Sequence, residues 1–107
     1  MIDHTRRDIL AQEIGEDFVA ELTDSFWADA RPLYETIAAC VKAGDAVGLR
    51  QALHTIAGAA GNIGLTGIAA AAEEAGSAVK SGGQPDIDRL SAAMKETLAQ
   101  LEARAAA

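Results

Sequence analysis

The chain has 107 residues and a formal net charge of -7, and half of its residues are hydrophobic although only 4% are aromatic. This length fits one domain with a single core. The acidic balance argues against nucleic acid and anionic membrane surfaces as partners, because such binders present clustered Lys and Arg. No stretch approaches the roughly 20 apolar residues of a membrane span and no signal peptide opens the chain, so we expect a cytoplasmic protein.

Alanine supplies much of the hydrophobic content, and β-branched residues never cluster into strand-like runs. Since alanine is the best helix former, the composition predicts an all-α domain. The single Cys40 excludes an internal disulfide and a cysteine-based metal site. We interpret it as a small buried residue in a reducing cytoplasm, with redox sensing as the alternative.

The first predicted helix covers residues 5–13 and is closed by Gly15. Glu16 and Asp17 favour the start of a long second segment, because acidic residues suit a helix N-terminus. Pro32 predicts a kink in this segment, or a new helix that begins near residues 29–31. The apolar stripe expected to face the core consists of Phe18, Leu22, Phe26, Leu33, Ile37 and Val41.

The rest of the chain divides into three further helices. Gly44 and Asp45 end one helix and begin the next, which Gly64 closes. Thr66 is the expected cap of the Ala-rich helix over 67–80, with Leu65 packing at its entry. After the loop at 81–86, a last helix carries one apolar stripe of Ile87, Leu90, Met94, Leu98 and Leu101. Short turns between long helices predict an antiparallel up-down four-helix bundle over about 16–104, with a short extra N-terminal helix.

The helix over 46–63 directs His54 away from the core. At about 100° per residue, its apolar residues point within roughly 40° of one direction, and His54 lies about 140° from it. Gly58 lies about 180° from the core, Gly61 about 120°, Arg50 about 100° and Ala57 about 80°. The surface on the C-terminal side of His54 therefore carries nothing larger than a methyl group. The inward set is Leu49, Leu53, Ile56, Ala60 and Ile63.

Three interpretations of these glycines stay open: helix–helix packing, an incidental feature beside an ordinary surface histidine, or clearance for a partner that docks on a reactive imidazole. No Ser or Cys with a nearby carboxylate accompanies His54, and His4 is the only other histidine, so neither hydrolysis nor metal binding is supported. The chain lacks a phosphate-binding loop. Neutral imidazole is a competent nucleophile toward phosphorus, and phosphoryl transfer needs mainly positioning and charge neutralisation. The residues favour a carrier rather than an enzyme.

The segment ALHTIAGAAGNIG, residues 52–64, resembles the signature of histidine-containing phosphotransfer (HPt) domains, roughly H-x-[LI]-K-G-[SA]-x-x-x-[LI]-G. The matching residues are His54, Ile56, Gly58, Ala59, Ile63 and Gly64. The resemblance implies that 1–107 is a single HPt-like domain in which His54 accepts a phosphoryl group from one receiver aspartate and donates it to another. It further implies a bacterial multistep two-component relay, with response-regulator receiver domains and a hybrid histidine kinase as partners.

The same resemblance implies a monomer without autokinase activity, which binds no cofactor because Mg²⁺ and the catalytic aspartates belong to the receiver. Met1 and the short tail favour a free-standing domain. One position departs from the pattern: Ala57 stands where the family usually has Lys. Arg50 is a candidate for the missing charge, and Gln51 for a hydrogen bond. The predicted docking surface around His54 consists of Arg50, Gln51, Ala57, Gly58 and Gly61.

The departure at Ala57 keeps two rival hypotheses open. The first is a non-catalytic interaction module that binds receivers or a kinase without phosphotransfer. The second is a structural bundle that self-associates through its Gly/Ala face.

Overall fold

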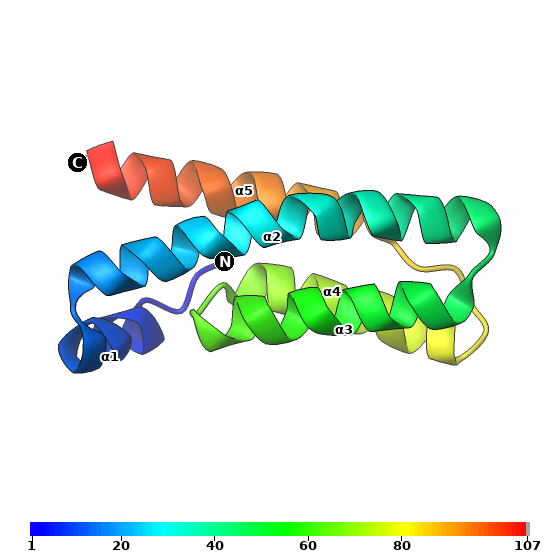
Figure 1. Cartoon of the computed structure of the whole chain (residues 1–107), viewed down its shortest axis with the longest axis horizontal. Helices are drawn as coiled ribbons and strands as arrows, with labels where there is room; N and C mark the ends of the chain where they lie inside the picture. The colour runs from blue at the N-terminus through cyan, green and yellow to red at the C-terminus, as the bar shows by residue number, and fades with distance from the viewer. Residues whose placement is uncertain (107) are drawn as a thin grey trace.

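The computed structural model describes residues 1–106, which form five helices and, within that range, no strand, so the predicted all-α class is confirmed. The helices are α1 (His4–Ile14), α2 (Glu16–Ala43), α3 (Ala46–Asn62), α4 (Thr66–Lys80) and α5 (Ile87–Ala106). The four long helices run along one axis as antiparallel neighbours, and the short α1 lies at one end (Figure 1). This is the predicted up-down bundle with an added N-terminal helix.

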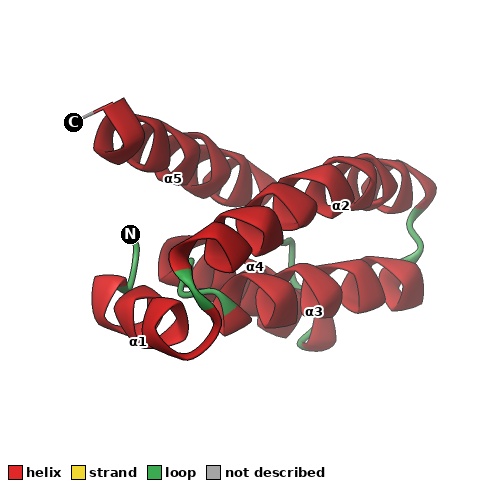
Figure 2. Cartoon of the chain, turned by 60° about the vertical axis from the view of Figure 1, so that its left-hand side comes forward, coloured by secondary structure: helices red, strands yellow, loops and turns green. Residues whose placement is uncertain are grey.

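The bundle is more open on one of its four sides. Helix α3 packs against α2 and α4, and α4 packs against α5. By contrast, no Cα atom of α5 comes within 8 Å of a Cα atom of α2 along the described chain. Figure 2 shows α5 diverging from α2 toward its C-terminal end. Helices α3 and α4 are therefore the most closely packed pair of the bundle.

The core is centred on α3 and α4. Leu53 and Ile56 of α3 and Ile68 of α4 are fully buried, as is Leu90 of α5. Between the large side chains, α3 and α4 contact each other through alanines, which allow their backbones to approach closely. The buried alanines are Ala52, Ala57, Ala60, Ala71, Ala72 and Ala75. Cys40 is also buried and has a free thiol, as expected for a structural cysteine.

The turns mostly follow the predicted chemistry. Gly44 adopts the left-handed conformation (φ +71°) that ends α2, and the Asp45 side chain caps α3 by accepting from the Gly48 N–H at 3.0 Å. Asp86 caps α5 in the same way through the Arg89 N–H at 2.9 Å. Gly64 has a φ of +76° two residues after the last residue of α3, and Ile63 occupies the cap position.

The predicted cap of α4 is wrong. Thr66 is the first residue of α4, Leu65 occupies the cap position, and no side chain caps this end. The Gly67 N–H instead donates to the Met1 carbonyl oxygen at 3.0 Å. The N-terminal segment of the chain therefore supplies the acceptor that a capping side chain supplies elsewhere.

Helix α2 continues through Pro32, so the alternative of a new helix near residues 29–31 is wrong. The axis of α2 bends near its middle in Figure 1, as expected where proline removes a backbone hydrogen bond. Its core stripe is also shifted. Phe18 is 49% exposed and Val41 45%, whereas Val19 is buried. Phe18 lies about 80° around the helix from the buried Phe26, and Val19 only about 20°.

A similar correction applies to α5. Leu98 is exposed and Thr97 is fully buried, although the predicted stripe contained Leu98. Thr97 lies about 20° around the helix from Leu90, and Leu98 about 80°. Hydrophobicity favoured the leucine, but the helix geometry selects the threonine for the core.

Candidate functional site

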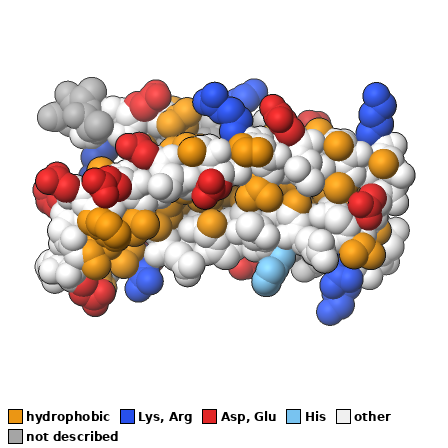
Figure 3. Space-filling model, in the orientation of Figure 1, with side chains coloured by type: hydrophobic (Ala, Val, Ile, Leu, Met, Phe, Trp, Pro, Cys, Tyr) orange, Lys and Arg blue, Asp and Glu red, His pale blue; other side chains and the backbone are white. Residues whose placement is uncertain are grey.

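Helix α3 presents His54 to solvent. The five residues predicted to point inward are buried, and His54 is exposed on the other side of the helix. Within residues 1–106 the imidazole takes part in no hydrogen bond or ion pair. Figure 3 shows a histidine on the lower edge of the molecule, over the α3–α4 layer, with Lys or Arg side chains on the same edge. The outward orientation of His54 is confirmed.

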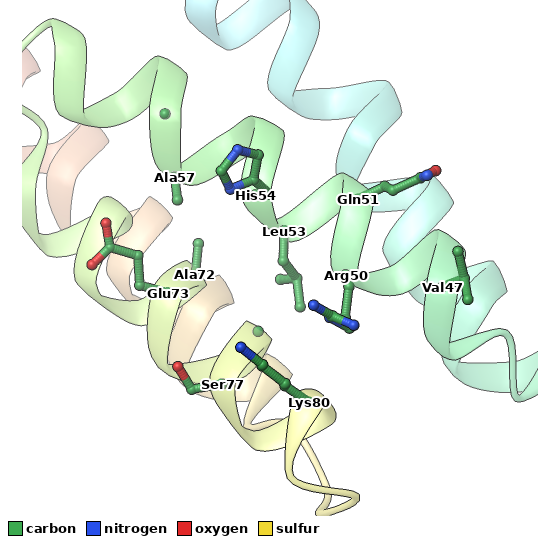
Figure 4. A pocket seen from close by; sticks show the side chains of 12 residues that line it. Val47, Arg50, Gln51, Leu53, His54, Ala57, Ala72, Glu73, Ser77 and Lys80 are labelled. Atoms are coloured by element: carbon green, nitrogen blue, oxygen red, sulfur yellow. The ribbon is translucent and has the colours of Figure 1, made fainter.

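His54 borders a groove of about 750 Å³ between α3 and α4. Its α3 wall and its α4 wall both carry small residues between the charged ones, so the groove is open to solvent (Figure 4). The lining residues are Val47, Arg50, Gln51, Leu53, His54, Ala57 and Gly58 from α3, and Ala72, Glu73, Gly76, Ser77 and Lys80 from α4.

The structure brings together four of the five residues predicted to surround His54. Arg50, Gln51 and Gly58 are exposed and line the groove. Ala57 also lines the groove but is only 6% exposed, so its side chain lies at the bottom of the groove and does not project from the surface. It lies at the margin of the inward face and α4 covers its methyl group. Gly61 is exposed but lies outside the groove.

The two glycines after His54 have different surroundings. A Cβ atom built on Gly58 meets nothing within 4 Å, so no neighbouring helix requires glycine there. A Cβ atom on Gly61 lies 4.0 Å from the Cβ of Ala69 on α4, which is ordinary contact. Packing inside this chain therefore does not explain Gly58, which costs about 1 kcal/mol relative to alanine in a helix interior. Of the three interpretations, clearance for a partner and an incidental glycine beside a surface histidine therefore both stay open for Gly58.

Two positive side chains reach one end of the groove. Arg50 extends from α3 and Lys80 from α4, and Figure 4 shows both at the end remote from Glu73. Neither cation forms a salt bridge within residues 1–106, where the ion pair of Arg89 with Glu74 lies outside the groove. In a chain with a net charge of -7, the groove thus concentrates unpaired positive charge next to His54.

The α4 wall was not predicted from the sequence. Glu73, Ser77 and Lys80 lie on this wall, and the sequence alone does not predict any of them as a neighbour of His54. Their signal is the spacing 73, 76, 77 and 80, which places them on one helical face. That spacing identifies one face of α4 but does not say which helix lies opposite it. The groove can therefore be recognised only from the packing of α3 on α4 in the structure.

The N-terminal segment fixes the C-terminal end of α3. Arg7 donates hydrogen bonds to the Ile63 carbonyl oxygen at 2.9 Å and to Thr23 Oγ1 at 3.1 Å. Burial lowers the pKa of the Arg7 guanidinium from its ordinary value, and the nearby positive charge of Arg104 lowers it further. The helix that carries His54 is therefore tied at this end to both α1 and α2.

The arrangement supports nucleophilic chemistry by a single imidazole. Residues 1–106 hold no cluster of three His, Cys, Asp or Glu side chains suited to a metal ion. None of the described helices is long and apolar enough to cross a membrane. An accessible ring nitrogen beside unpaired cations is suited to nucleophilic attack on an anionic phosphorus centre. It is less suited to act as the base in a hydrolytic reaction, because such a base needs a partner that orients it.

Comparison with known proteins gives one match to a family model, described as Hpt domain, over residues 21–104. The matched region contains α3, α4, the groove between them and His54. Searches of curated proteins and of solved structures give no match.

Proposed function

Because the chain belongs to the Hpt domain family, we propose that it is a phosphohistidine carrier in a bacterial multistep two-component phosphorelay, with His54 as the phosphoacceptor. The observation that carries this proposal is the exposed, unpaired imidazole of His54 at the edge of an open groove with two free cations. An Hpt domain carries a phosphoryl group on histidine, and His4, the other histidine, has its Nδ1 occupied by Arg104 at 2.7 Å.

In the proposed step, the unprotonated ring nitrogen of His54 attacks the phosphorus of a receiver aspartyl phosphate. Its lone pair forms the N–P bond, while the electron pair of the breaking O–P bond leaves with the aspartate carboxylate. The proton on the other ring nitrogen stays with the phosphorylated ring or exchanges with water. The reverse sequence, on a second receiver, returns the phosphoryl group to an aspartate and restores neutral His54.

The partners proposed are response-regulator receiver domains and a hybrid histidine kinase. In this proposal the receiver supplies Mg²⁺ and the aspartates. We further propose that the chain is a monomeric cytoplasmic carrier without autokinase activity. Its own contribution is an unobstructed nucleophile and a positive surface next to it, since phosphoryl transfer depends mainly on positioning and charge neutralisation.

The test is phosphotransfer profiling against the receiver domains of the source organism. The purified chain is mixed with each phosphorylated receiver, and transfer of label is followed over time. We expect transfer to the wild type and to His4→Gln, and none to His54→Gln. Failure of every receiver to label the wild type, under conditions in which another Hpt domain is labelled, overturns the carrier proposal.

A second candidate function is supported by Ala57, which places a buried methyl group where the family usually has lysine. In this alternative the chain binds receivers or a kinase through the groove and sequesters them without phosphotransfer. Receiver binding that survives His54→Ala, with no labelled wild type, favours this module over the carrier. Labelled wild type with any receiver rejects it.

A further inference from the structure

We propose that Arg50 and Lys80, from opposite walls of the α3–α4 groove, together bind the phosphoryl group that His54 carries. This inference rests on the proposed function and names the residues that neutralise the charge of the transferred group. The groove has two cations, Arg50 and Lys80, and they come from different helices. The sequence does not predict Lys80 as a neighbour of His54, because only the packing of α4 on α3 brings it into the groove.

Arg50 is placed by helix geometry. It precedes His54 by one turn of α3, and side chains at this spacing are neighbours with Cβ atoms about 5–6 Å apart. Arg50 is exposed and lines the groove, and Figure 4 shows its guanidinium on the side of α3 that faces α4. A guanidinium presents donors in a fixed fork that matches phosphate oxygens.

Lys80 completes the positive end from the opposite wall. It stands in the last turn of α4, and its side chain extends from α4 into the groove (Figure 4). The α4 residues on the way to His54 are Gly76 and Ser77, so no large side chain separates the ammonium from the groove. Lysine suits this position because it is a point charge on a flexible stem and can follow a group that arrives and leaves.

The two cations have no competing partner in the described chain. Neither forms a salt bridge within residues 1–106, although the chain carries 16 acidic residues. Glu73, the groove's own carboxylate, lies at its other end and forms no ion pair there either. Two cations left unpaired in an acidic protein are available for an anion, and the phosphoryl group on His54 is the anion that the proposed function delivers.

The experiment measures the pKa of the phosphoryl group on His54 by ³¹P NMR, after phosphorylation with phosphoramidate, which requires no receiver. We expect this pKa to rise by about half a unit in Arg50→Gln and in Lys80→Gln, because each change removes one nearby positive charge. Lys80→Arg restores the charge and is expected to restore the pKa. The matched control is Lys95→Gln on α5, which removes the same charge outside the groove.

The outcomes separate this inference from the proposed function. If His54 is phosphorylated but Lys80→Gln and Lys95→Gln give the same phosphoryl pKa as the wild type, the role of Lys80 is wrong and the carrier proposal stands. If the wild type gives no ³¹P signal that depends on His54, there is no phosphoryl group for Arg50 and Lys80 to bind and this inference fails, whereas the carrier proposal is still decided by transfer from a receiver. Circular dichroism of each variant checks that the exposed substitutions leave the helices intact.

Discussion

The guanidinium of Arg7 on α1 donates a hydrogen bond of 2.9 Å to the carbonyl oxygen of Ile63, directly after the end of α3. Its second nitrogen reaches Thr23 Oγ1 on α2 at 3.1 Å. The Thr23 hydroxyl in turn donates to the Val19 carbonyl oxygen at 2.8 Å. One half-buried side chain thus joins the short N-terminal helix to the long second helix and to the helix that carries His54.

Replacing Arg7 by alanine is expected to destabilise the fold. The change removes two hydrogen bonds from a charged donor and leaves the Ile63 carbonyl without this partner, which corresponds to a loss of about 1.5–3 kcal/mol in the free energy of unfolding. Urea denaturation followed by circular dichroism measures it. Arg6→Ala is the control, because Arg6 is exposed, and its expected effect is within about 0.5 kcal/mol. Equal stability of the two variants contradicts the structural role of Arg7.

The segment before α1 also constrains α4. A Cβ atom on Gly67 lies 2.7 Å from the backbone nitrogen of Met1, a distance that forces the N-terminal segment to move. We expect Gly67→Ala to lower the free energy of unfolding of the full chain by about 1–2 kcal/mol, since it also weakens the bond from the Gly67 N–H to Met1.

The same substitution is expected to change sign in a chain that begins at Asp3, made by cleavage of a removable tag. Without Met1 there is no atom to displace, and alanine is the better helix former by about 1 kcal/mol. A double-mutant cycle in urea compares Gly67→Ala in the two chains. Additive effects, with the same loss in both, mean that contact with Met1 is not the reason for glycine at this position.

The fully buried Thr97 gives a prediction of the opposite sign. Its hydroxyl oxygen has no hydrogen-bond partner in the described chain, and an unpaired buried polar group is costly. Thr97→Val keeps the shape and removes the polar atom, so we expect the free energy of unfolding to rise by about 1 kcal/mol. Thr36→Val is the matched control, because that exposed hydroxyl donates to the Pro32 carbonyl oxygen at 3.1 Å. If Thr97→Val instead lowers the free energy of unfolding, the Thr97 hydroxyl is not an unpaired group in the folded protein.

The helices and the direction of His54 were predictable because they depend on local signals. Gly44 and Asp45 act through the backbone within a few residues, and the direction of each α3 side chain follows from the helical repeat alone. The errors at Phe18 and Leu98 have one cause: a large hydrophobic residue was preferred over its smaller neighbour at the correct angle. Over 20 residues or more, such a preference moves the stripe around the helix.

Contacts between distant segments were not predictable in this way. The Met1 carbonyl that serves as acceptor for α4, and the bond from Arg7 to the residue after α3, join residues far apart in the chain. The position of Lys80 beside α3 is also a contact between distant segments. The helical pattern of α4 shows which residues share a face with Lys80, but not that α3 lies next to this face. The α3 wall of the groove was therefore predicted, and the α4 wall required the structure.

Gly58 offers the most direct test of the groove as a docking surface. A Cβ atom there meets nothing within 4 Å, so Gly58→Ala fits the fold and is expected to raise stability by up to about 1 kcal/mol. Gly58→Leu also leaves the bundle folded but fills the space beside His54, and we expect it to reduce phosphotransfer from a receiver at least tenfold. Ala92→Leu, an exposed change on α5, is the control for added bulk.

Because leucine leaves His54 chemically unchanged, phosphorylation by phosphoramidate should continue in Gly58→Leu at close to the wild-type rate. Receiver-dependent transfer that is equally fast in the folded Gly58→Leu variant shows that clearance at Gly58 is not what the partner needs.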